Sequence, residues 1–535
     1  NIGFLVTSQE RTGSVGTQGR DVTVEKGELR SNVDISALNG TVKIFGTNKG
    51  LVVDNIQVNE KKQDENGIWN ITEKGYFTTF NIDAQNVKIT GANDYGIMAQ
   101  NVLSRYENVS TTADRNSYVD IDAANTVEIY GGKAGILASL TKSKEEGSQT
   151  VEVINTNLSS NVDLNAQNVV IGSKEYGVLA LEKGNVNIDS VITNITSEQT
   201  GINVEDKSIV NITANSAGIL AKDDGIRTGS GGIVTVKHQD NTNGNDYLSV
   251  TSDLRALTAA SNDGSNGGRI SVTTDKISLY GNNKVDDNQY TGGAADDQLR
   301  VQAVVFGYNS DIDLAADTIN IVSKNTEKID DSDNRLYAAV QSRGASDINI
   351  AGNSTIMSEN GVALYATKLK QLGNIQLSDD KQSVINLADK DNEGNYLSHN
   401  IMGDIVAGKD SEITIGGKGN FVGAANGANA IEVLAANGGK VDLGLQDGVL
   451  IGRVDDYYQV KDANTSNDMG LVDTAFRNNK LYTDISTSCE ITLNMNENST
   501  WYNIGQSYVS NVNLNGGTID LGQDKGSSVN IGKLS

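Results

Sequence analysis

Side chains that could carry out catalysis are few in this chain. Its two histidines, His238 and His399, lie far apart in the sequence. A Ser–His–Asp triad needs a histidine beside an exposed serine on a sharp turn, and no Gly-x-Ser-x-Gly motif occurs. Zinc sites normally need His and Cys at short spacing, whereas Cys489 is the only cysteine. We therefore predict neither histidine-based nor zinc-based catalysis, and we expect Cys489 to be a small packed side chain.

Paired carboxylates are the other residues that could do chemistry. Glycoside hydrolysis needs two carboxyl groups about 5–9.5 Å apart across a cleft. The chain has six Asp-Asp pairs, at Asp223-Asp224, Asp286-Asp287, Asp296-Asp297, Asp330-Asp331, Asp379-Asp380 and Asp455-Asp456. All six lie in predicted turns, where aspartate caps its own backbone. We predict that the chain is not an enzyme, and a polysaccharide-active enzyme is the less favoured alternative.

A short acidic stretch resembles the start of a calcium loop. Asp389, Asp391 and Glu393 alternate along the chain, and Gly394 follows them. Calcium loops place oxygen ligands at alternate positions and end on a bidentate Glu at position 12, but Asn400 stands there. The stretch is a weak calcium candidate with a polar turn as its default interpretation, and we predict no cofactor.

Composition limits the class of partner. The chain has 43 Lys and Arg against 68 Asp and Glu, a formal net charge of −25. Nucleic acid and anionic lipid need clustered Lys and Arg, and no such cluster occurs, so we expect no nucleic-acid partner. Proline is absent, which suits a chain built of paired strands, because proline cannot donate to a hydrogen-bond ladder.

Short alternating runs predict β-strands. In each run the apolar residues lie two apart and Asn, Asp, Lys or Thr lie between them, which places the two sets on opposite faces of a strand. Gly, Asn and Asp between the runs favour sharp corners. The clearest runs are 21–24, 41–44, 185–188, 233–236, 347–350, 412–415 and 440–443.

A repeat of about 40 residues organises these strands. Ala-Gln-Asn-Val and Tyr-Gly-Ile-Met-Ala patterns recur around Gly96, Gly135, Gly177 and Gly218, with gaps of 39, 42 and 41 residues. Such periods mark arrays whose units bury their apolar faces by stacking. We predict an all-β fold, a right-handed parallel β-helix (solenoid) with loop insertions, in which each repeat makes two coils of about 20 residues; right-handedness is the general preference of parallel crossovers. A β-sandwich array or a propeller is the alternative.

Segments that break the strand pattern are predicted to be loops outside the coil. Loops on a rigid scaffold are the usual place for recognition. We expect residues 282–298 and 455–480 to be the candidate contact regions, although most such loops are tolerated insertions. The predicted loops are 60–74, 105–118, 142–149, 282–298, 324–335 and 455–480.

The repeat changes character from Met402 onward. The sequence reads Asn498-Ser-Thr-Trp501, then Ser507-Tyr-Val509, then Val512-Asn-Leu-Asn-Gly-Gly-Thr-Ile-Asp-Leu521. This part resembles the end of a pertactin-like autotransporter passenger of type V secretion, with Trp501 as a large apolar cap. We therefore divide the chain into a repetitive β-helix stalk, residues 1–401, and C-terminal pertactin-like coils, residues 402–535, ending at the start of an autochaperone-like segment.

The resemblance implies a location and a class of function. It implies a passenger at the bacterial cell surface, anchored to the outer membrane by a C-terminal barrel that this sequence does not contain. We expect an adhesin that binds host or neighbouring-cell proteins or glycans. Self-association that drives cell aggregation and biofilm formation is the alternative. The sequence does not identify the ligand or its binding residues.

Overall fold

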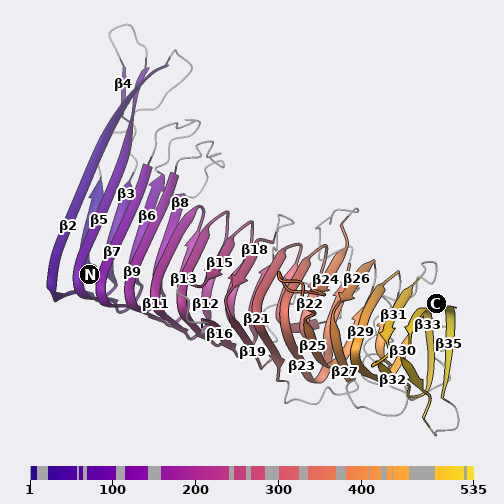
Figure 1. Cartoon of the computed structure of the whole chain (residues 1–535). Helices are drawn as coiled ribbons and strands as arrows, with labels where there is room; N and C mark the ends of the chain where they lie inside the picture. The colour runs from indigo at the N-terminus through magenta and orange to yellow at the C-terminus, as the bar shows by residue number, and fades with distance from the viewer. Residues whose placement is uncertain are drawn as a thin grey trace. The chain divides into compact units, whose positions relative to one another are not determined.

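The computed structural model is all-β, and its strands form a parallel β-helix (Figure 1). This confirms the predicted fold class. No helix of the described residues is long and apolar enough to cross a membrane. The structure describes residues 2–8, 22–56, 60–63, 69–103, 115–142, 158–239, 246–260, 267–282, 300–324, 335–368, 381–408, 410–422, 431–436, 438–456, 489–522 and 527–535.

The chain divides into two compact units, Asn1–Ile219 with Gly232–Asn241 and Leu220–Gly231 with Thr242–Ser535. The strands of the first unit are β1 (Ile2–Ser8), β2 (Val22–Gly46), β3 (Lys49–Ile56), β4 (Glu60–Gln63), β5 (Trp69–Gly91), β6 (Tyr95–Leu103), β7 (Arg115–Gly131), β8 (Ala134–Lys142), β9 (Leu158–Ser173), β10 (Tyr176–Leu181), β11 (Gly184–Ser197), β12 (Thr200–Val204), β13 (Ile209–Ala221, whose last two residues belong to the second unit) and β15 (Ile233–Lys237).

The second unit contains the remaining strands. These are β14 (Asp224–Thr228), β16 (Tyr247–Ser252), β17 (Arg255–Ala260), β18 (Arg269–Thr273), β19 (Lys276–Gly281), β20 (Arg300–Tyr308), β21 (Asp311–Ser323), β22 (Arg335–Arg343), β23 (Asp347–Thr367), β24 (Ser383–Leu387), β25 (Ser398–Ala407), β26 (Ser411–Ile415), β27 (Lys418–Val422), β28 (Ile431–Ala435), β29 (Lys440–Ile451), β30 (Arg453–Asp455), β31 (Glu490–Asn496), β32 (Thr500–Tyr502), β33 (Gln506–Asn515), β34 (Thr518–Asp520) and β35 (Ser528–Leu534). The predicted boundary between residues 401 and 402 lies inside β25 and stays a prediction.

Each coil presents three faces, which we call A, B and C. In one coil, residues 160–166 of β9 lie on face A, residues 168–173 of β9 on face B, and β10 on face C. The inward side chains are apolar and buried, as Val162, Val169 and Val178 show at 0% exposure. Parallel strands of neighbouring coils stack at about 4.8 Å, so the alternating pattern in the sequence becomes an apolar core inside and polar columns outside.

The predicted division of each 40-residue repeat into two coils is wrong. Ala134 pairs directly with Tyr95 in β6 and with Tyr176 in β10, so successive repeats are neighbouring strands and each repeat is one coil. Where the connections are short, a coil takes 24 residues, because Tyr176 pairs with Thr200. The longer coils contain segments 104–114 and 143–157, which lie outside the described residues.

The repeated glycines allow two faces to approach each other. A Cβ added to Gly135 would lie 2.4 Å from Cγ2 of Ile171 and 2.7 Å from the carbonyl oxygen of Gly177. A Cβ on Gly177 would lie 2.5 Å from the carbonyl oxygen of Gly201. The column therefore continues at Gly201, 24 residues on, and the prediction that Gly218 belongs to it is wrong.

A column of buried serines closes the corner between face C and face A. In the second unit, Ser383 Oγ donates to the Thr367 carbonyl oxygen at 3.0 Å and accepts the Ala345 N–H at the same distance. Ser346 Oγ likewise donates to the Arg343 carbonyl oxygen at 2.8 Å. Each hydroxyl satisfies backbone groups that a buried corner would otherwise leave without partners. Ser117, Ser160, Ser310, Ser346, Ser383 and Ser411 occupy this position.

One predicted loop is a strand pair. Residues 60–74 include β4 and the start of β5, which pair in antiparallel fashion from Glu60↔Thr72 to Gln63↔Trp69. Figure 1 shows β2 and β5 extending beyond the neighbouring strands of their unit toward β4. The alternation of apolar residues is weak in this segment, and for that reason the sequence pattern missed the pair. The other predicted loops lie wholly or mostly outside the described residues.

Candidate binding surface

Polar side chains of face A form continuous columns in the first unit. Successive register pairs place Asp34 beside Asn81, Asn81 beside Asp120, and Asp120 beside Asp163. Asp163 in turn pairs with Asn187. The pleat of each strand turns these positions outward, while the apolar residues between them face the core.

Hydrogen bonds between coils hold these columns in place. Asn81 Nδ2 donates to Asp34 Oδ1 at 2.6 Å, and Asn187 Nδ2 donates to Asp163 Oδ1 at 2.6 Å. Asn211 Nδ2 then donates to Asn187 Oδ1 at 2.8 Å. A side-chain amide can both donate and accept, so an asparagine such as Asn187 continues the row of hydrogen bonds from one coil to the next. The outer face is therefore an ordered array of oxygen and nitrogen atoms.

The centre of this array is acidic. Tyr118 OH donates to Asp163 Oδ2 at 2.5 Å. Burial raises the pKa of Asp120, and the charges of Asp122 and Asp163 raise it further. Burial also raises the pKa of Tyr118, as does its hydrogen bond to Asp163. Face A of the first unit therefore repels anions.

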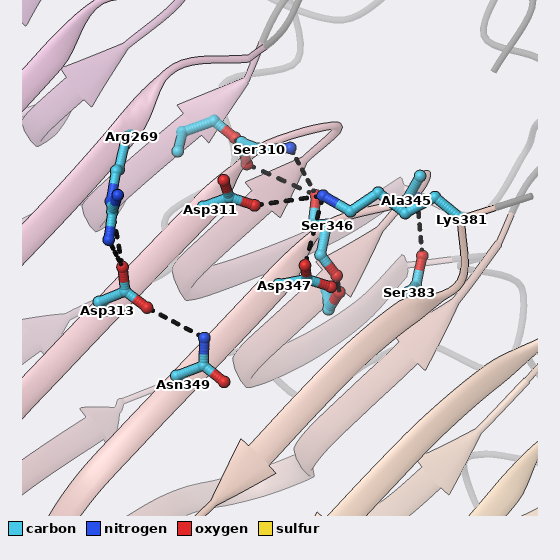
Figure 2. A network of polar contacts seen from close by, with 12 residues as sticks. Arg269, Ser310, Asp311, Asp313, Ala345, Ser346, Asp347, Asn349, Lys381 and Ser383 are labelled. Atoms are coloured by element: carbon cyan, nitrogen blue, oxygen red, sulfur yellow. Dashed lines mark hydrogen bonds and ion pairs between the residues drawn. The ribbon is translucent and has the colours of Figure 1, made fainter. Parts of the chain in front are cut away.

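Face A of the second unit carries both charges (Figure 2). Arg269 Nη2 donates to Asp313 Oδ2 at 2.6 Å, and Asn349 Nδ2 donates to Asp313 Oδ1 at 3.0 Å. Lys381 Nζ lies 3.2 Å from Asp311 Oδ1 and 3.3 Å from Asp347 Oδ2.

Two carboxylates stabilise the positive charge of Lys381. Partial burial opposes the ammonium charge, but Asp311 and Asp347 outweigh it and raise the pKa of Lys381. The lysine is therefore a fixed cation that links two neighbouring coils. Side chains around it are one-third to one-half exposed, so the network is part of the accessible surface.

The weak calcium candidate forms a polar turn. The side-chain amide of Asn395 donates to Asp391 at 2.9 Å, as do the backbone N–H groups of Asn395 at 2.8 Å and Glu393 at 2.9 Å. These bonds, the Asn395 side chain above all, hold the pKa of Asp391 below its usual range. Asp389 Oδ1 accepts the Gly417 N–H at 2.7 Å. Two of the three candidate carboxylates, Asp389 and Asp391, thus accept N–H groups of the turns around them. The described part of the chain contains no group of three His, Cys, Asp or Glu side chains that could hold a metal.

His399 belongs to a buried Ser–His pair. His399 is fully buried in β25, where its Nε2 donates to the Ala388 carbonyl oxygen at 2.9 Å. Its Nδ1 therefore accepts the Ser354 hydroxyl proton, at 2.8 Å. Burial lowers the pKa of His399, so the ring is held neutral. This Ser–His pair lies between coils with Ser354 2% exposed, where a substrate has no access.

The described Asp-Asp pairs have structural partners. Asp224 accepts from Arg255 Nε at 2.8 Å in a buried ion pair. Asp455 lies 2.6 Å from Arg453 Nη2, and Asp456 Oδ2 accepts from Ser510 Oγ at 2.6 Å. The other pairs lie outside the described residues, as do the candidate contact regions 282–298 and 455–480, except Asn282, Asp455 and Asp456.

Sequence reasoning missed the polar columns as a candidate surface. The signal was present as a short pattern, in which a corner Ser or Gly is followed by one further residue and then by two apolar residues flanking one Asp, Asn, Ser or Thr. Ser346-Asp-Ile-Asn-Ile350 and Ser160-Asn-Val-Asp-Leu164 are examples. Aligning the chain on this pattern would have placed the polar residues that follow the corner by three positions, such as Asp163 and Asn349, at equivalent positions of face A.

Comparison with known proteins adds no relative. No protein family, curated protein or solved structure matches the chain. The assignment of a function therefore depends on the surface itself.

Proposed function

We propose that the chain is a binding protein of the bacterial cell surface, an adhesin of the pertactin-like autotransporter type. The observation that carries this proposal is the ordered outer surface, whose side chains are held by hydrogen bonds from coil to coil before any partner arrives. Side chains already fixed in place lose less entropy when a partner binds. A parallel β-helix with such faces is suited to binding an extended partner along its side.

The C-terminal coils support the autotransporter part of the proposal. Trp501 is fully buried in β32, and its indole N–H donates to the Gly452 carbonyl oxygen at 2.9 Å. A large apolar side chain with its one polar atom satisfied suits a cap at the end of a narrowing core. This is the role that the pertactin-like resemblance implies for Trp501.

Self-association is the second candidate. The second unit favours it, because Arg269 and Lys381 lie among Asp311, Asp313 and Asp347 and could pair with a second copy. The first unit opposes it, because its face A would meet a like-charged face. Aggregation of cells that display the chain should then depend strongly on salt, since ions screen exposed charges. Clumping that is absent at every salt concentration would exclude this candidate.

The purified chain should be screened on an array of glycans and extracellular-matrix proteins, with released sugars assayed in the same wells. We expect retention on specific spots without release of sugar. Release of sugar would contradict the adhesin proposal and would indicate a polysaccharide-active enzyme. A blank array with salt-dependent clumping of displaying cells would favour self-association.

A further inference from the structure

Face B of the first unit contains a fully described grid of nine outward positions in three neighbouring coils. Register pairs place Glu128 beside Val170 and Tyr130 beside Gly172. Val170 in turn pairs with Asn194, and Asn168 pairs with Ile192. The face-B grid consists of Thr126, Glu128 and Tyr130 in β7, Asn168, Val170 and Gly172 in β9, and Ile192, Asn194 and Thr196 in β11.

An apolar diagonal crosses this grid. Tyr130, Val170 and Ile192 are 39%, 42% and 37% exposed. Each residue of the diagonal lies in the coil after the previous one, two positions before the register partner of that previous residue. The strand rise and strand spacing make this a separation of about 8 Å. Polar side chains flank the diagonal on both sides, with Glu128 and Asn168 on one and Asn194 and Thr196 on the other. The result is an exposed stripe with an apolar centre and a hydrogen-bonding rim.

Tyr130 leans along the sheet because its neighbour is a glycine. A Cβ on Gly172 would lie 3.2 Å from Cδ2 and 3.8 Å from Cε2 of Tyr130. The ring therefore occupies the space that a side chain at residue 172 would take. Phe45, in the same column of face B, has Thr90 rather than a glycine as its neighbour in the following coil, and Phe45 is 68% exposed. Because residue 172 is a glycine, the Tyr130 ring can lie beside it and form one end of the apolar stripe.

The charge of this region favours an uncharged ligand. The one charged residue of the grid, Glu128, is bound by Lys88 of the preceding coil, with Nζ 2.6 Å from Oε2. The two charges cancel locally, in contrast to the carboxylates of face A. The net charge of −25 over the chain opposes the approach of acidic sugars.

We propose that the diagonal Tyr130–Val170–Ile192 binds a neutral glycan, which places the C–H faces of its sugar rings on the stripe and its hydroxyl groups against the flanking side chains. A sugar ring has an apolar C–H face and a rim of hydroxyls, and this matches an aromatic and aliphatic centre with Asn, Thr and Glu at its edges. The proposal rests on the proposed adhesin function and names its ligand class and site.

Saturation-transfer NMR on the whole chain tests it, with cellotetraose and chitotetraose as neutral probes and tetragalacturonate as the acidic one. We expect a neutral probe to bind in preference to tetragalacturonate. Tyr130→Ala should weaken this binding about tenfold, the scale of one lost aromatic contact. Gly172→Val should weaken it similarly, because the Cβ already lies close to the ring and the two added methyl groups crowd it further. Phe45→Ala is the matched control and should bind as the unchanged chain does.

Urea unfolding of each variant separates loss of the stripe from loss of the fold. Equal binding by Tyr130→Ala and the unchanged chain would overturn the proposal, as would a preference for tetragalacturonate or no binding of either neutral probe. Adhesion of displaying cells that persists unchanged in Tyr130→Ala and Gly172→Val would reject this stripe and leave the adhesin function standing. Matrix-protein binding lost in both variants would show that the stripe takes a protein and would likewise overturn the glycan proposal.

Discussion

At the scale of residues, the single cysteine belongs to the column of corner serines. Gly438 N–H donates to Cys489 Sγ at 3.5 Å, as Ala345 N–H donates to Ser383 Oγ. Gly439 and Cys489 precede the paired residues Lys440 and Glu490, just as the serines precede theirs. The sequence alone indicated only a small packed side chain, whereas Cys489 is half-buried and lies just before β31. Its corner role could not be predicted, because its partner Gly438 is 51 residues away.

Replacing this thiol should show the role of the column. We expect Cys489→Ser to unfold at the same urea concentration as the unchanged chain or a higher one, because a hydroxyl accepts the same N–H group more strongly. Cys489→Val should lower stability by about 1 kcal/mol, the usual net value of one hydrogen bond. Urea unfolding followed by circular dichroism measures both. Equal stability of the serine and valine variants would show that the corner hydrogen bond contributes nothing.

Protonation of His399 should make the stability of the folded chain depend on pH. Burial lowers its pKa, although the Ala388 carbonyl and Asp389 oppose this, so the folded chain binds the proton less readily than the unfolded chain does. The unfolded value is about 6.5, and the stability that neutral His399 provides is therefore present above that pH and lost as the pH falls below it.

The matched variant is His399→Gln, which removes the titration. The stability advantage of the unchanged chain over this variant should shrink between pH 7 and pH 5. Urea midpoints of the two proteins across this range give the comparison, and other titrating groups cancel in the difference. A constant advantage across the range would refute a neutral, buried His399.

At the scale of elements, the strands were predictable and their spacing was not. Alternation of apolar and polar residues identifies face A in nearly every coil, because one side of the strand is buried and the other side is exposed to solvent. The period was misjudged because the early coils contain the additional segments 104–114 and 143–157 and take about 40 residues, whereas a coil without such a segment takes 24. Gly218 then fell near the expected 41-residue step by coincidence, while the structural equivalent, Gly201, came earlier in the chain.

Two glycine substitutions distinguish the true column from the apparent one. A Cβ at Gly135 meets Cγ2 of Ile171 at 2.4 Å and the Gly177 carbonyl oxygen at 2.7 Å, so Gly135→Ala forces backbone to move. Overpacking of this kind costs about 1–3 kcal/mol. At Gly218 the nearest atom is Asn194 Oδ1 at 2.9 Å, on an exposed side chain that can turn away.

Thermal or urea unfolding should therefore separate the variants. Gly135→Ala should be clearly destabilised, and Gly218→Ala should be neutral or slightly more stable, since alanine costs less backbone entropy than glycine in a strand. Equal loss of stability in both variants would mean that Gly135 and Gly218 are equally closely packed, contrary to this expectation.

At the scale of the whole molecule, a coil is the unit by which such a chain lengthens. A solenoid needs no closed core of fixed size, because each coil contacts only its neighbours. The loops that the sequence offered as contact regions lie mostly outside the described residues. The polar columns and the face-B grid arise only when residues 24 to 47 apart are stacked. The corner pattern could have aligned the columns of face A, whereas no local motif reveals the face-B grid.

Removing one coil from the first unit tests this description. The corner Glu182-Lys183-Gly184 and the corner Asp206-Lys207-Ser208 have the same conformation, with φ of 46° and 68° in the first and 53° and 62° in the second. The Gly184 N–H also donates to Ser208 Oγ at 3.1 Å, which places the two corners in one column. Deleting residues 184–207 therefore joins Lys183 to Ser208 at a corner that already fits.

The shortened chain should fold with the same strand signal in circular dichroism and a similar urea midpoint. The control deletion of residues 184–203 removes four residues fewer and joins Lys183 to Val204, a face-C residue, at the start of face A. A face-C segment would then stand where the corner and the first strand of the next coil must begin, which disrupts corner and register together. We expect that variant to be markedly destabilised or aggregated. If both deletions behave alike, the 24-residue coil is not the structural unit, and the columns on faces A and B lose the register on which they depend.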